Sequence, residues 1–247
     1  MKNEKLNEIA KEYVGTGFSK ILEWSLDLAP YVGKIIQNRK LNRVERRIKE
    51  YAEHLKRIDM LFASEKLSKD YIQEKIGPIV LSDLLEEHED AKIIYLLQGF
   101  ENVFINECKN ESVVINYFDT LRSLRYEDVR MLFYLSGIAE NPFKDYTKGS
   151  PEHILSKQIY SKLERLYLIK SASTFSYLEL GPEAEETDLK PMLTPYGKNF
   201  IKFIAIDFDE AAYEKRIKDY DNTNGDVVPK IKFIEQDLKN PKPAVWG

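Results

Sequence analysis

The feature that most constrains the fold is a run of seven apolar residues that are spaced alternately three and four positions apart. The run consists of Leu41, Val44, Ile48, Tyr51, Leu55, Ile58 and Phe62. On an α-helix this spacing places every member on one stripe of the surface. The pattern lasts for about three heptads. We therefore expect one long amphipathic helix here, preceded by a break at Pro30 and Gly33.

The charges around this stripe are unusual for the chain. Residues 34–57 carry nine Lys or Arg against three Glu, a net charge of +6, whereas the whole chain has a net charge of −4. Three interpretations stay open: a solvated face beside a core stripe, a contact with nucleic acid or anionic lipid, and a helix that pairs with a partner or a second copy through the stripe. The anion contact would use Arg39, Lys40, Arg43, Arg46 and Arg47.

The rest of the first half also has helical patterns. With 43% hydrophobic and 12% aromatic residues, the chain of 247 residues can form a globular core. Gly77-Pro78 predicts a break between helices, because proline disfavours helix in the residue before it. Residues 91–105 are apolar around most of a helix and predict a central core helix. Ser123 is the expected N-cap of a helix over 126–138.

The second half follows a different order. Ser150-Pro151 predicts the start of a helix that ends near Lys170. Residues 175–180 and 191–194 favour strands around an acidic turn, and Thr194-Pro195 predicts the cap of another helix. This order of helix, helix, hairpin and helix is typical of a winged-helix unit.

These patterns together predict a mainly α protein, in which a helical bundle is followed by a winged-helix-like unit with a small β-hairpin. Four parts are expected. They are an amphipathic N-terminal element with the long basic helix (1–76), a central helical bundle (77–138), the winged-helix-like unit (139–206), and a C-terminal helix with an extended tail (207–247).

Parts of this pattern resemble the Abi-alpha-like family of uncharacterised prokaryotic proteins. The resemblance spans residues 77–206 and includes a proline-led helix, a helix ending in a leucine pair, and a Leu-x-x-Leu-x-x-x-Asp pattern. The residues that carry it are Gly77-Pro78-Ile79, Leu96-Leu97, Leu121, Leu124 and Asp128. The segments Leu163–Ile169 and Leu193–Phe200 are similar to the end of many degenerate winged-helix modules. The resemblance implies a link to phage infection and no catalytic residues.

The chain contains no recognisable set of catalytic or metal-binding residues. Gly15-Thr16-Gly17 is too short to be a phosphate-binding loop, and it favours an ordinary helix break. One cysteine and three scattered histidines do not form a nucleophile with its base or a zinc site. The acidic run 86–90 favours a solvated helix end over a metal site. We therefore expect no enzyme activity, no metal and no cofactor.

Three functions remain as hypotheses. The first is a cytoplasmic interaction or regulatory protein that contacts an unidentified protein partner or a second copy of itself. The second is a DNA-binding regulator that uses Lys157, Lys162 and Arg165 on its recognition helix. The third is a peripheral membrane effector. Its inserting residues would be Phe18, Ile21, Leu22, Trp24 and Leu28. A cytoplasmic location is expected because the N-terminus does not resemble a secretory signal.

Overall fold

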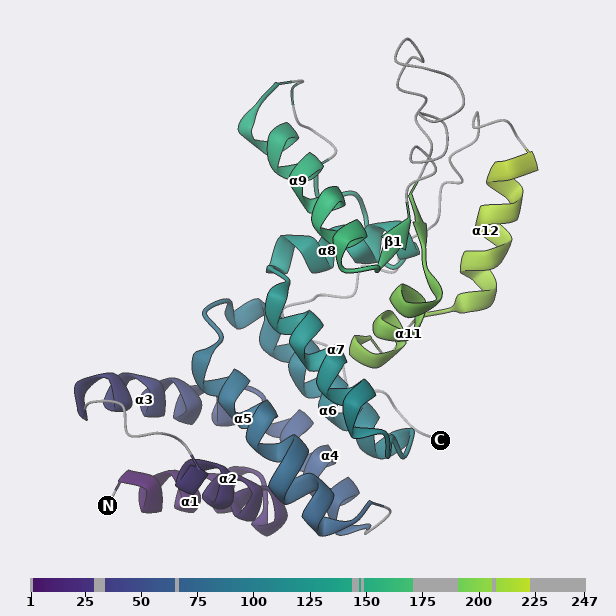
Figure 1. Cartoon of the computed structure of the whole chain (residues 1–247). Coiled ribbons are helices and arrows are strands. Elements are labelled where there is room, and N and C mark those ends of the chain that lie inside the picture. Colours follow the sequence, from purple (N-terminus) through teal and green to yellow (C-terminus); the bar gives the residue numbers. More distant parts are fainter. Residues whose placement is uncertain are drawn as a thin grey trace.

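The computed structural model is mainly helical, with one short pair of strands, as the sequence predicts (Figure 1). The structure describes residues 2–28, 34–64, 67–143, 147, 149–170, 191–205 and 208–222. The side chains of residues 24–40 lie outside this description. No helix among the described residues is both long and apolar enough to cross a lipid bilayer.

The first part of the chain forms a helical assembly around one core. Its elements are α1 (Lys2–Tyr13), α2 (Thr16–Leu28), α3 (Lys34–Glu50), α4 (Ala52–Ala63), the π-helix η1 (Tyr71–Ile76), α5 (Gly77–Glu86), the 3₁₀-helix η2 (Asp90–Lys92), α6 (Ile93–Ile105) and α7 (Glu111–Ser123). Helix α2 packs against α1, α4 and α5, whereas α6 packs against α4, α5 and α7. Helix α6 is buried around much of its circumference, as expected for a central helix.

The predicted single long helix is wrong, because the chain breaks at Tyr51 into α3 and α4. Tyr51 has φ −105° and ψ 23°, outside the helical range. Its hydroxyl donates a hydrogen bond to the carbonyl oxygen of Asp90 at 3.2 Å. The other six members of the apolar stripe are buried, and Tyr51 is half-buried. The stripe therefore faces the core of its own chain along both helices.

The two glycine-containing breaks have different structures. Gly77-Pro78 marks the boundary between η1 and α5, but the chain does not leave the helical range there: Ile76 and Gly77 are both right-handed helical, and the proline lies in the first turn of α5. Between α1 and α2, the backbone N–H of Phe18 donates to a carboxylate oxygen of Asp59 at 2.7 Å. A Cβ atom on Gly15 would lie 2.2 Å from the same carboxylate. This break is therefore filled by a side chain from α4.

The second part of the chain packs on α6 and α7. Its elements are α8 (Tyr126–Ser136), α9 (Pro151–Arg165), β1 (Ile169–Lys170), β2 (Met192–Leu193), α11 (Pro195–Ile204) and α12 (Glu210–Asn222). The strands are antiparallel and pair Ile169 with Leu193 and Lys170 with Met192. The predicted strand over 175–180, the acidic turn and the tail after 222 lie outside the described residues.

Two of the three predicted caps in this region are confirmed. The hydroxyl of Ser150 accepts the backbone N–H of His153 at 3.3 Å, and that of Thr194 accepts the N–H of Gly197 at 2.9 Å. The expected cap at Ser123 is wrong: this residue ends α7, and its hydroxyl donates back to the Thr120 carbonyl. The start of α8 is held instead by the carboxylates of Asp128 and Glu89, which accept backbone N–H groups there.

Candidate interaction surface on helix α9

Helix α9 is attached to the protein by a narrow stripe. Ser156, Ile159 and Leu163 are its buried residues, and they face α8 and β1. Their spacing of three and four leaves most of the circumference facing outward. In Figure 1, α9 lies beside α8 at one end of the molecule, away from α1 to α4. The burial pattern of α9 therefore leaves one long face of this helix exposed.

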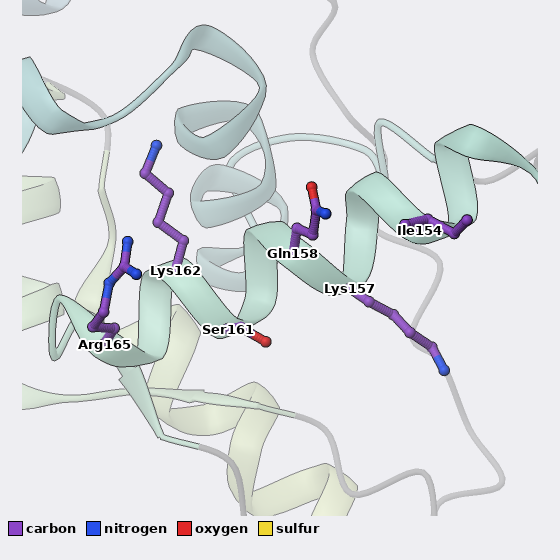
Figure 2. A pocket seen from close by; sticks show the side chains of 6 residues that line it. All are labelled: Ile154, Lys157, Gln158, Ser161, Lys162 and Arg165. Atoms are coloured by element: carbon purple, nitrogen blue, oxygen red, sulfur yellow. The ribbon is translucent and has the colours of Figure 1, made fainter.

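A shallow depression runs along this outward face. It is lined by Ile154, Lys157, Gln158, Ser161, Lys162 and Arg165 (Figure 2). We call these six residues, together with the exposed Leu155 beside Ile154, the α9 face. The side chains of Lys162 and Arg165 extend to the same side of the helix, whereas Lys157 extends to the other side. The three basic residues predicted to contact nucleic acid therefore lie on one element but do not converge on one point.

Lys162 is engaged within the protein. Its ammonium group lies 2.5 Å from a carboxylate oxygen of Asp128, whose side chain is buried. The same oxygen accepts the backbone N–H of Arg125 at 2.7 Å, at the start of α8. Because the Asp128 charge balances that of Lys162, this lysine fastens α9 to α8 and presents little net charge to a ligand.

The rest of the α9 face is both basic and apolar. Lys157 and Arg165 are exposed. Ile154 is 54% exposed, and its neighbour Leu155 is 42% exposed. Exposed acidic residues on the same helix, Glu152 and Glu164, reduce its positive charge. A face of this composition suits a partner that offers both apolar side chains and carboxylates.

The end of α9 has an uncommon backbone. Tyr167 adopts a left-handed backbone conformation with φ 58°, and it is 65% exposed. Its N–H donates to the Glu164 carbonyl at 2.8 Å, and the Leu168 N–H donates to the Leu163 carbonyl at 3.0 Å. These two bonds form a Schellman motif, a helix ending in which glycine is the common residue at the left-handed position.

The arginines of α3 predicted to bind an external anion have partners inside the chain. Arg43 donates to the carbonyl oxygens of Leu85 and Glu87, each at 3.2 Å. Arg46 donates to a carboxylate oxygen of Asp90 at 2.5 Å. These carbonyls belong to the C-terminal end of α5, where cationic groups are favourable. The side chains of the other two predicted residues, Arg39 and Lys40, lie outside the described part.

Arg47 is the most buried of these arginines, with a side chain only 1% exposed. It donates to the carbonyl oxygens of Leu84 and Glu87, the latter at 2.7 Å. It also donates to one carboxylate oxygen of Asp90, from Nε at 3.0 Å and from Nη2 at 2.6 Å. Burial raises the pKa of Asp90, but its bond to Arg47 and the charges of both arginines outweigh this effect, so the pKa lies below its ordinary value.

The acidic run before α6 joins several elements, whereas we had expected a solvated helix end. We call Glu87, Glu89 and Asp90 the acidic hub. Glu87 lies 2.5 Å from the buried ammonium group of Lys92. Glu89 accepts the N–H of Tyr126 at 2.8 Å and so caps α8. In the part of the chain that the structure describes, no group of three or more His, Cys, Asp or Glu forms a potential metal site.

The remaining predicted surfaces lie mostly in the core. The stripe expected to contact a partner or a second copy is covered by the chain itself. Phe18, Ile21 and Leu22, which were expected to insert into a membrane, are at most 2% exposed. Insertion would therefore require α2 to leave the core. The side chains of Trp24 and Leu28 lie outside the description.

The sequence located the acidic run 86–90 but did not reveal that the acidic hub joins several elements, and it did not indicate the left-handed backbone of Tyr167. A left-handed tyrosine carries no local sequence signal except its place between a helix and a strand, where glycine is common. No protein-family model, curated protein or solved structure matches the chain.

Proposed function

We propose that this chain is a non-enzymatic interaction or regulatory protein, and that the α9 face binds a partner protein. The observation that carries the proposal is the exposure of Ile154 and Leu155 beside Lys157 and Arg165 on a helix that is buried along only one narrow stripe. Apolar side chains of this size lose contact with water when a partner covers them, which stabilises a complex. The role in phage and host conflict rests on the sequence resemblance alone.

The second candidate is a DNA-binding regulator with a winged-helix-like unit. The order of α7, α8, α9, β1, β2 and α11 favours it, because α9 then occupies the place of a recognition helix. The neutralisation of Lys162 by Asp128 counts against it. Glu152 and Glu164 on the exposed surface would repel phosphates. We therefore rank a protein partner first.

The experiment compares two variants with equal charge changes. Lys157→Glu with Arg165→Glu alters the α9 face. Lys11→Glu in α1 with Lys109→Glu in the loop between α6 and α7 is the matched control at exposed positions. Proteins captured from the natural host are purified and titrated against each variant. We expect binding to be at least about ten-fold weaker for the face variant, equivalent to about 1.4 kcal/mol, and unchanged for the control.

Fluorescence anisotropy with duplex DNA over a salt series tests the second candidate. If a protein binds the α9 face, DNA should bind only at low salt and should lose similar affinity with both double variants, because they change the net charge equally. Sequence-dependent binding at physiological salt that only the face variant abolishes would overturn our proposal and support the regulator.

A further inference from the structure

Three helices in the described part of the chain end in a Schellman motif, and only one of them has glycine at the left-handed position. At the end of α8 the left-handed residue is Gly137, with φ 87°. At the ends of α6 and α9 the corresponding residues are Glu107, with φ 47°, and Tyr167. Side chains other than glycine, asparagine and aspartate are disfavoured in this conformation, because Cβ approaches the following carbonyl oxygen. Tyr167 therefore occupies a position where glycine would be more stable.

The fold uses the backbone of Tyr167 and not its ring. The carbonyl oxygen accepts the hydroxyl of Thr194 at 2.5 Å, and the N–H bonds to Glu164. Any residue except proline provides these two groups. Within the described residues, the Tyr167 side chain takes part in no hydrogen bond, ring contact or ion pair, and most of it is exposed. Intramolecular contacts therefore do not explain the large aromatic side chain.

We propose that Tyr167 is an anchor residue for the partner protein, and that its ring enters an apolar pocket flanked by carboxylates. This inference rests on the proposed function of the α9 face. Tyrosine is enriched among the residues that dominate binding energy, since it buries a large area with few rotatable bonds. Unusual backbone conformations are retained where function requires them.

The charge around Tyr167 indicates the chemistry of the partner. Around Tyr167 the exposed cations Arg165 and Lys170 outnumber the exposed Glu164, and Lys162 is balanced internally by Asp128. Carboxylates on the partner would complement the two outward cations. A symmetric contact between two copies of this surface would bring like charges together. The occupant is therefore an acidic protein surface and not the same surface of a second copy.

The first test measures stability. Tyr167→Gly should raise the melting temperature by roughly 2–4 °C, because it removes the left-handed penalty and little buried area. Glu107→Gly is the matched control for the same motif at the end of α6, and its melting temperature should also rise. Tyr167→Phe should leave the melting temperature unchanged. If Tyr167→Gly does not raise it, the conformational cost on which the inference depends is absent.

The second test measures binding. A photo-crosslinking amino acid is placed at position 155 or 167 of the full chain in host cells, with exposed Met60 of α4 as the control position. The protein crosslinked from position 155 is purified and titrated. We expect Tyr167→Gly to weaken its affinity at least about ten-fold, whereas Tyr167→Phe and Glu107→Gly keep it.

The possible results separate the two proposals. If positions 155 and 167 give no crosslinked protein beyond that seen at position 60, the proposed function of the α9 face fails. If a partner is found and Tyr167→Gly binds it as tightly as the natural chain, only the role of Tyr167 fails. Crosslinking to nucleic acid from both positions would overturn the choice of a protein partner.

Discussion

Replacing Arg47 by methionine tests most directly whether the arginines of α3 hold this helix to α5 and the acidic hub. Methionine keeps an apolar stem of similar length but removes the donors to Leu84, Glu87 and Asp90. Hydrogen bonds from a charged group contribute about 1.5–3 kcal/mol each. Loss of the bonds to the three acceptors would therefore lower the free energy of unfolding by at most roughly 5–9 kcal/mol. The variant no longer buries a guanidinium, which offsets part of this loss. The Asp90 side chain is 44% exposed and keeps its bond to Arg46, so the remaining cost comes mainly from the carbonyl oxygens of Leu84 and Glu87, at about 1–3 kcal/mol for each buried acceptor left unpaired.

We expect Arg47→Met to lower the free energy of unfolding by about 2–4 kcal/mol at neutral pH. Urea titration followed by circular dichroism would measure this change. Arg46→Met is the matched control: its side chain is 58% exposed and bonds to the same carboxylate. It should lower stability by less than about 1 kcal/mol. Equal and small effects of the two variants would show that the buried arginine does not hold α3 to α5, and our reasoning would be wrong.

Three further predictions concern pH and two close contacts. The pKa of Asp90 is lowered in the folded state, so the stability that this carboxylate contributes is present above its unfolded pKa of about 3.9 and is lost as pH falls through the folded pKa. The difference in free energy of unfolding between the natural chain and Arg47→Met, measured by urea titration, should therefore narrow below about pH 4. Gly197→Ala should reduce the melting temperature strongly, because its Cβ would lie 1.9 Å from the carbonyl oxygen of Leu168; a near-normal melting curve would contradict the close packing of α11 on the end of β1. Asp59→Ala should lower the free energy of unfolding by about 1–2 kcal/mol, a typical loss for a helix cap, and a urea titration that detects no change would exclude a capping role for this carboxylate.

The sequence predicted those features that depend on neighbouring residues. Ser150 and Thr194 each cap a helix that begins at the next residue, and both caps were recognised from the hydroxyl followed by proline. The cap of α8 was missed for the opposite reason. One of its acceptors is Glu89, which lies 37 positions before Tyr126 in the sequence. A local pattern cannot identify a partner at that distance.

The basic segment over α3 and the start of α4 shows that a local sequence pattern also fails to identify distant charge partners. The sequence correctly indicates that residues 34–57 are rich in Lys and Arg. It does not show that Arg47 is separated by 43 positions from its acidic partner Asp90. The predicted length of the helix was wrong because the apolar spacing continues through Tyr51, whereas the backbone does not. A periodic pattern specifies which face is buried and leaves open whether the helix bends.

The packing of α2 on α5 also limits how this protein could change by recombination. Phe18, Ile21 and Leu22 line the same small space as Val80 and Leu84. A recombination event between residues 76 and 77 would separate these side chains and give each product an uncovered apolar surface. Such products would be prone to aggregate. The helices on both sides of this point are therefore expected to be inherited together.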